Sequence, residues 1–316
     1  MALSIFNSEK RVLLALLSAI AVIIPLGILN IVIHLDTASG KNGTIAMQKF
    51  ANRKVAPAQK YDIVFLGDSR VLIGINPEFF ERKLNCTAFN AAFTAGGINA
   101  EIYRHTEEKL LSSNANVPRA VIIGITVMSM DEERRSNYRF NQIKSELATQ
   151  RNGGFSDYIR IPFQKIRIKH FKNLFKDEKL SVVPYDNGYL ERFATVKKKL
   201  QDFNIQATKI SFKTYKFSQK NLQELSEYIR KWKKENITVF AFRPPVNIAM
   251  DKLENECGKC DFALIQQTVE KSGGVWLEVD NRETYNSYDS SHLASAEAIR
   301  LSEDLSDKVA AYFRKK

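Results

Sequence analysis

Residues 61–70 read YDIVFLGDSR, and this stretch decides the fold class. The apolar run at residues 63–66 is typical of a buried strand, and it ends abruptly at Gly67. A strand followed at once by a glycine turn places the next side chains at the carboxyl edge of a parallel sheet, where open α/β proteins bind ligands. Ser69 stands at that edge. A serine there is a candidate nucleophile, provided that a general base can reach it.

Four further apolar runs predict strands at residues 87–90, 120–126, 237–242 and 275–279. Helical patterns lie between and after them: apolar residues recur at spacings of three and four from Leu222 to Trp232 and again from Ala298 to Phe313. Alternating strands and helices predict a three-layer α/β/α domain, with a mostly parallel sheet of about five strands covered on both faces.

The basic residues are concentrated in one part of the chain. The formal charge of the whole protein is +12, and residues 151–220 contain 16 Lys and Arg against 6 Asp and Glu. Most of this stretch lies within residues 131–215, which interrupt the strand–helix rhythm and are interpreted as an insertion between the third and fourth strands. A basic surface of this kind suits an anionic glycan or anionic lipid headgroups. A solvated helical face that packs on the core is the plainer alternative.

Residues 12–33 read VLLALLSAIAVIIPLGILNIVI, which is 22 residues without a charge. About 20 apolar residues span a bilayer, so the sequence predicts an uncleaved membrane anchor at residues 12–34. A secretory signal peptide is the competing interpretation, but its apolar core is usually shorter. Lys10 and Arg11 precede the run and favour a cytoplasmic N-terminus.

The predicted organisation is therefore a cytoplasmic N-terminus at residues 1–11, the anchor at 12–34, a tether at 35–59 and the α/β domain at 60–316. This order makes the chain a single-pass protein of the cell membrane, with its folded domain outside the cytoplasm. No nucleic-acid partner is expected in that location.

The chain contains three cysteines, and two of them form a C-x-x-C at Cys257 and Cys260. A single C-x-x-C without a second pair or nearby histidines makes a poor zinc site. A local disulfide is the simpler expectation in an oxidising compartment. No metal or cofactor is expected from the sequence.

A possible base for Ser69 lies near the other end of the chain. Asp289 and His292 form a D-x-x-H pattern just before the last predicted helix, and the chain has only four histidines. Histidine suits proton transfer because its pKa is near neutral. A carboxylate on the second ring nitrogen fixes the tautomer and stabilises the imidazolium. The three residues make a candidate Ser-His-Asp triad.

With these motifs the sequence resembles the SGNH/GDSL hydrolase superfamily, from about residue 60 to the C-terminus. The resemblance implies a flavodoxin-like sheet order. It also implies that Ser69, in the block 67–69 that reads GDS, is the nucleophile. In the last block, His292 would be the general base and Asp289 its orienting acid.

The two middle blocks of that family are only partly present. Residues 90–97 read NAAFTAGG, so Asn90 and the trailing Gly96 and Gly97 are kept while Ala92 replaces the first glycine. The resemblance implies that backbone N–H groups from Ala92 to Gly97 bind the oxyanion.

The third block, usually Gly-x-Asn-Asp, is replaced by GITV at residues 124–127, so the oxyanion asparagine is missing and Thr126 is a partial substitute. Loss of one oxyanion donor costs about 10²–10³ in rate.

Two arginines lie beside the expected site. Arg70 follows the candidate nucleophile, and Arg243 ends the fourth predicted strand. Either side chain could bind an anionic substrate group, and for Arg70 a structural salt bridge is the simpler interpretation.

The anchor and the altered blocks resemble membrane-anchored SGNH proteins of cell-envelope polymers, such as those of alginate O-acetylation and teichoic-acid D-alanylation. This resemblance implies acyl transfer or ester hydrolysis on an envelope glycan or a lipid-linked polymer, beside a membrane-bound O-acyltransferase as partner. The alternative is a domain of decayed activity that serves as a binding or scaffolding partner of such an acyltransferase.

Overall fold

The computed structural model describes residues 44–94, 98–114, 116–134, 136–152, 181–194, 196–256 and 259–315. The chain divides into two compact units. One unit comprises residues 48–147 and 180–316 and holds the main sheet and the candidate site. The other comprises residues 1–47 and 148–179, of which only the ends of two helices are described.

The described helices and strands follow one another in the order α2 (Thr44–Val55), β1 (Ile63–Leu66), α3 (Ser69–Gly74), α4 (Glu78–Leu84), β2 (Ala88–Asn90), α5 (Ala100–His105), β3 (Ala120–Gly124), α6 (Tyr138–Asn152), β4 (Ser181–Pro184), β5 (Leu190–Phe193), α9 (Lys198–Thr214), α10 (Gln219–Lys234), β6 (Thr238–Phe242), α11 (Ile248–Glu256), α12 (Phe262–Lys271), β7 (Val275–Trp276) and α13 (Ser295–Arg314). A π-helical turn, Thr106–Leu110, extends α5. Single 3₁₀ turns cover Met128–Met130, Glu132–Arg134 and Arg282–Thr284.

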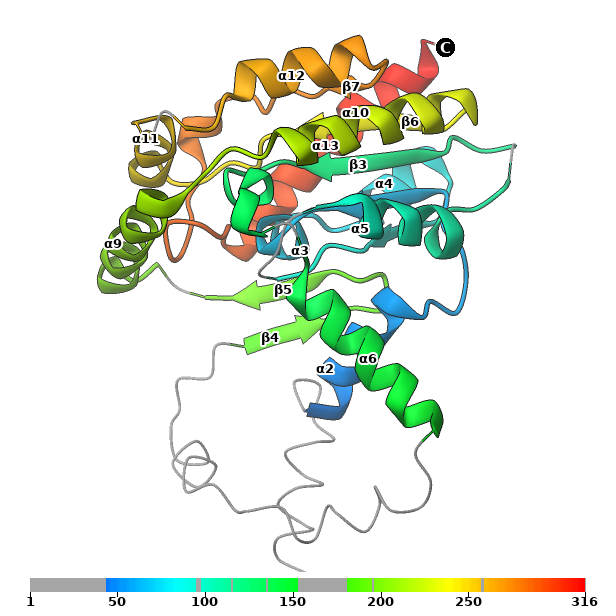
Figure 1. Cartoon of the computed structure of the whole chain (residues 1–316), viewed down its shortest axis with the longest axis horizontal. Coiled ribbons are helices and arrows are strands. Elements are labelled where there is room, and N and C mark those ends of the chain that lie inside the picture. Colours follow the sequence, from blue (N-terminus) through cyan, green and yellow to red (C-terminus); the bar gives the residue numbers. More distant parts are fainter. Residues whose placement is uncertain are drawn as a thin grey trace, which may run out of the picture. The chain divides into compact units, whose positions relative to one another are not determined.

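The main sheet has five strands in the order β2-β1-β3-β6-β7, and all neighbours are parallel. This is the predicted α/β class with the flavodoxin-like order, and each predicted strand is found (Figure 1). The last strand is shorter than predicted: β7 keeps only Val275–Trp276 of residues 275–279.

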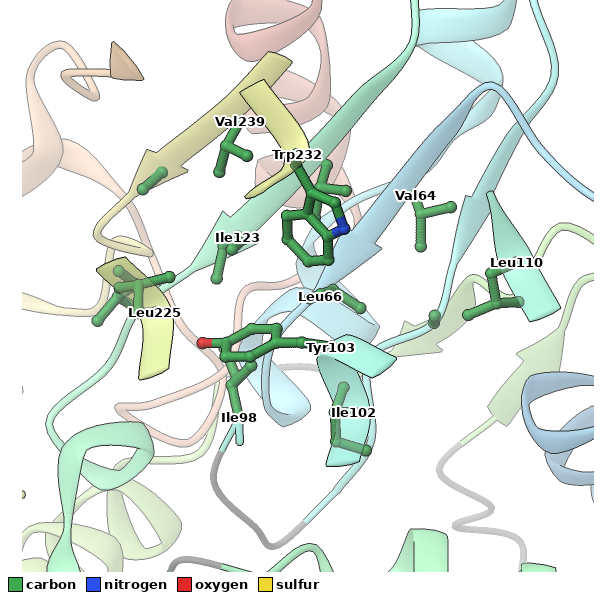
Figure 2. Close-up of a cluster of buried hydrophobic side chains, with 14 of the residues drawn as sticks. Val64, Leu66, Ile98, Ile102, Tyr103, Leu110, Ile123, Leu225, Trp232 and Val239 are labelled. Carbon is green, nitrogen blue, oxygen red and sulfur yellow. The ribbon is translucent and has the colours of Figure 1, made fainter. Parts of the chain in front are cut away.

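Alternate side chains of the strands enter two different apolar layers. Val64, Val121 and Val239 are in register across β1, β3 and β6 and pack with α5, α10 and α12. On the other face Phe65 meets Phe80 of α4, while Phe240 meets Tyr312 and Phe313 of α13. Figure 2 shows the first layer closing around Trp232, Tyr103 and Leu225. Burial on both faces explains why the strands read as continuous apolar runs.

The insertion at residues 131–215 is more regular than its sequence suggests. It contributes α6, the antiparallel hairpin of β4 and β5, and α9, and residues 153–180 within it lie outside the described residues. The hairpin forms a separate two-stranded sheet beside the main one (Figure 1). Its strands have four residues each, too short for a two-residue period to stand out in the sequence.

The predicted tether at residues 35–59 is wrong for its second half. Helix α2 occupies Thr44–Val55, and Phe50, Ala51 and Lys54 are buried. The Lys54 ammonium donates to the carbonyls of Asn90 and Gly188 and lies over the Phe50 ring. The sequence suggested a polar tether because the residue that anchors this helix to the domain is a lysine.

Lys54 gives the folded protein a distinct dependence on pH. Burial lowers the pKa of its ammonium well below the usual value. The unfolded chain therefore binds more protons, and the free energy of unfolding rises with pH until the unfolded pKa of about 10.4. We expect Lys54→Met to lose this rise below the unfolded pKa, as measured by urea unfolding across the alkaline range. The exposed Lys60→Met is the control, and equal slopes for wild type and Lys54→Met would contradict the prediction.

The predicted anchor at residues 12–34 lies outside the described residues. None of the helices in the described part of the chain has the length and hydropathy needed to cross a bilayer.

Candidate active site

The turn between β1 and α3 holds Ser69 at the carboxyl edge of the sheet. A Cβ on Gly67 would lie 2.2 Å from Cγ2 of Val71 and 2.7 Å from its Cβ, so only glycine lets helix and strand approach this closely. Asp68 caps α3 by accepting a hydrogen bond from the Arg70 amide. Ser69 is thereby the first residue of α3.

The structure brings together the three residues that the sequence singled out. Ser69 Oγ lies 2.7 Å from Nε2 of His292. Nδ1 of the same ring lies 2.8 Å from Oδ2 of Asp289. Both contacts are within hydrogen-bond distance, so one imidazole bridges the serine hydroxyl and the carboxylate. This is the relative placement that nucleophile, base and orienting acid require.

A tight turn aligns the acid with the base. Oδ1 of Asp289 accepts hydrogen bonds from the amides of Ser291 and His292. Ser290, between Asp289 and Ser291, has a φ of 76°, a left-handed conformation that is uncommon outside glycine. Partial burial would raise the pKa of Asp289, but these hydrogen bonds and the nearby imidazole hold that pKa below its usual value. Asp289 is therefore held as an anion that can orient the ring of His292.

The insertion supports this turn from the side, which the sequence did not reveal. From α9, Gln201 Nε2 donates to the Ser287 carbonyl and Asn204 Nδ2 donates to the Asp289 carbonyl, each at 2.8 Å. The Tyr288 ring stacks on His292. In the sequence, Gln201 and Asn204 look like ordinary polar positions of a basic helix, and only their spacing of three residues hinted at a shared face.

Arg70 lies within a buried ionic network and not in an open binding position. Its Nε donates to Oγ of Ser291 at 3.1 Å, and its Nη2 lies 2.5 Å from Oε1 of Glu254. The other carboxylate oxygen of Glu254 lies 3.0 Å from Nη2 of Arg243. Burial alone would lower the pKa of Arg70, but Glu254, Asp68 and Asp289 raise it overall. Glu254 was missed in the sequence because no motif marks a lone helical glutamate.

Arg243 also borders a recess. A pocket of about 270 Å³ is lined by Arg243, Arg282, Phe262, Trp276 and neighbouring residues. The Arg243 guanidinium lies 4.0 Å from the centre of the Phe262 ring. The Asp251 carboxylate contacts both arginines, and Arg243 lies 3.2 Å from it. The guanidinium groups at this recess are therefore already partly neutralised.

The described residues of the second motif block, 90–94, stabilise the fold through hydrogen bonds. The Asn90 side chain donates to the carbonyls of Val71 and Ile75, at 2.9 and 2.8 Å, and accepts from the Ala92 amide. Asn90 thus ties the end of β2 to α3. The Ala92 N–H is already paired and is not a free oxyanion donor. Gly96 and Gly97 lie outside the described residues.

The Thr126 hydroxyl is also already hydrogen-bonded within the protein. It donates to Oδ2 of Asp68 at 2.6 Å, and the residue is buried. It therefore braces the cap of α3 and does not point a free donor at the site. In the part of the chain that is described, the Ser69 N–H has no hydrogen-bond acceptor, which leaves it available to an oxyanion.

Thr126→Val tests the bracing role. Loss of the hydrogen bond to the Asp68 carboxylate is expected to lower the free energy of unfolding by about 1–3 kcal/mol. Thr126→Ser keeps the hydroxyl and is the matched control. Urea unfolding provides the measurement. Unchanged stability together with a hundred-fold loss of activity would instead identify Thr126 as an oxyanion donor.

Within the described ranges, no group of three or more His, Cys, Asp or Glu side chains is arranged to hold a metal ion. The expected disulfide cannot be placed, since Cys257 lies outside those ranges.

No protein-family model and no curated protein matches this chain. Among solved structures, the lipase/acylhydrolase from Enterococcus faecalis is similar at 10% identity and a TM-score of 0.39, over 79% of this chain and 95% of that one. A proposed platelet activating factor from Streptococcus pneumonia is similar at 12% identity and a TM-score of 0.40, over 84% and 92%. Neither likeness is close enough to carry a conclusion about this chain.

Proposed function

We propose that this protein is a serine-dependent ester hydrolase or O-acyltransferase. The observation that carries the proposal is the position of the His292 ring, 2.7 Å from Ser69 Oγ and 2.8 Å from Asp289 Oδ2. A serine hydroxyl becomes an effective nucleophile when a base accepts its proton during attack.

The reaction follows from this geometry. Ser69 Oγ attacks the acyl carbonyl carbon while its proton passes to Nε2 of His292. The Ser69 N–H donates to the oxyanion. The tetrahedral intermediate then expels the alcohol, which takes the proton from Nε2, and leaves an acyl ester on Ser69. Water or an acceptor hydroxyl attacks this ester and gives its proton to Nε2. The second tetrahedral intermediate then collapses to the acid or the new ester, and Ser69 Oγ leaves with the proton from Nε2.

The substrate class in this proposal is an O-acyl group of a cell-envelope glycan or lipid-linked polymer, with a membrane-bound O-acyltransferase as partner. It rests on the partial resemblance of the motif blocks and on the predicted anchor at residues 12–34. The incomplete oxyanion hole favours transfer to a bound acceptor over general esterase activity, because such a site depends on substrate binding for much of its rate.

A fluorophosphonate probe tests the proposal, since it labels only activated serines. Wild-type full-length protein is expected to be labelled at Ser69, and both Ser69→Ala and His292→Ala are expected to lose the label. The exposed Ser113→Ala is the control and should be labelled like wild type. Labelling that persists in His292→Ala would contradict a base role for that residue.

The second candidate is a non-catalytic binding or scaffolding domain. The paired Ala92 amide and the paired Thr126 hydroxyl favour it, because each fills a position expected of an oxyanion donor. Folded wild-type protein that takes up no probe at Ser69 would support this candidate.

A further inference from the structure

The segment from β5 through α9 carries an exposed apolar surface. Its large hydrophobic side chains Phe193, Val196, Phe203 and Ile210 are 50%, 55%, 67% and 66% exposed. Phe203 and Ile210 are seven residues apart, so they lie on the same side of α9 two turns apart. Isolated exposed apolar side chains are common. Two on the same side of α9, with Phe193 and Val196 just before that helix in the chain, indicate an interaction surface.

Exposed lysines lie around Phe203 and Ile210 on α9. Residues 199, 203, 206, 210 and 213 recur at spacings of four and three and are all exposed, which makes them one stripe, the outer stripe of α9. Lys199 and Lys213 stand at its two ends. Lys198 and Lys209 are exposed nearby, and Asp202 is the one acidic residue of the helix.

The inner side of the same helix contacts the candidate active site. Gln201 and Asn204 hold the carbonyls of Ser287 and Asp289, and the Lys197 amide donates to the Tyr288 carbonyl at 3.4 Å. Phe212 is buried. The outer stripe is therefore one helix diameter away from the turn that aligns His292.

We propose that the outer stripe of α9 docks on an anionic phospholipid bilayer and holds the Ser69 site at the membrane surface. This proposal builds on the proposed function and narrows its substrates to esters of lipids or of lipid-linked polymers. Apolar side chains with flanking lysines match the boundary between acyl chains and anionic headgroups. A single convex helix can enter a deformable headgroup layer, whereas a protein partner needs a complementary groove.

The short segment between the predicted anchor and α2 agrees with docking at the membrane surface. If residues 12–34 span the bilayer, nine residues, 35–43, precede α2. Nine residues reach at most about 30 Å. The start of α2 could then lie no farther than this from the membrane surface.

Site-specific quenching tests the proposal in the full-length protein. Phe203→Trp is reconstituted into nanodiscs of brominated phosphatidylcholine, with or without brominated phosphatidylglycerol. Ile299→Trp on α13 is the control, because Ile299 is 42% exposed and lies on a different helix, which packs against Phe240 of the main sheet. The unsubstituted protein provides the background from Trp232 and Trp276.

Emission from position 203 is expected to fall by at least half in the anionic discs and less in the zwitterionic ones, while position 299 stays unquenched. Lys199→Gln with Lys213→Gln should bring the quenching at 203 down to the zwitterionic level. Equal quenching at both positions, or none at 203, would overturn the proposal. A detergent-solubilised dimer that Phe203→Glu with Ile210→Glu dissociates would show that a second copy of the chain occupies the stripe.

The proposed docking and the proposed catalytic function can be rejected independently of each other. Phe203→Glu with Ile210→Glu is expected to keep fluorophosphonate labelling of Ser69 in detergent, since neither side chain belongs to the site. Quenching at position 203 without any labelling of Ser69 would reject the proposed function and leave the docking intact. Labelling without quenching would reject the docking alone.

Discussion

Asp289→Asn is expected to slow acylation of Ser69 by about 10⁴-fold while the protein stays folded. The carboxylate accepts from Nδ1 of His292 at 2.8 Å and thereby leaves Nε2 free to accept the serine proton. An asparagine amide can donate to Nδ1 and favours the opposite tautomer, in which Nε2 carries a hydrogen and cannot act as a base. The second-order rate constant of fluorophosphonate labelling measures this effect directly.

The control for this experiment is Asp280→Asn, which removes a carboxylate whose side chain is 68% exposed and which pairs with Lys308 at the surface. This variant should label at the wild-type rate. The two amides that bond to Oδ1 of Asp289 can bond equally well to an asparagine oxygen, so the turn itself should survive. If Asp289→Asn labels within ten-fold of wild type, the carboxylate does not orient the base.

Glu254→Leu is expected to lower the free energy of unfolding by about 3–5 kcal/mol. The Glu254 side chain is 1% exposed and lies between the guanidinium groups of Arg70 and Arg243. Removing it leaves the Arg70 guanidinium, whose side chain is 9% exposed, without its ion-pair partner, while Arg243 keeps Asp251. The cost of an uncompensated buried charge exceeds that of a lost surface pair. Denaturant unfolding followed by the fluorescence of buried Trp232 measures the change.

Glu256→Leu is the matched control, because this residue lies on the same helix and is exposed. It should change stability by less than about 0.5 kcal/mol. Labelling of Ser69 should also fall in Glu254→Leu, since Arg70 holds Ser291, whose amide bonds to Asp289. A stability change no larger than that of the control would show that the two arginines find other partners.

The sequence by itself determined the sheet and the three residues at its edge. The run at residues 63–66 predicted β1 because a strand buried on both faces must be apolar throughout. The D-x-x-H pattern located Asp289 and His292 because a spacing of three residues lets one turn carry both side chains. These features are local, so they can be seen in one stretch of chain.

The tertiary structure alone decided what surrounds that edge. Whether Ala92 or Thr126 could serve the oxyanion depended on partners far away in the chain or on fine geometry, and both groups proved to be paired. Glu254 joins Arg70 across 184 residues, and Asn204 reaches the Asp289 carbonyl across 85. A single side chain carries no mark of a partner so distant, because hydrogen bonds and ion pairs are set by where the elements pack and not by the residue types alone.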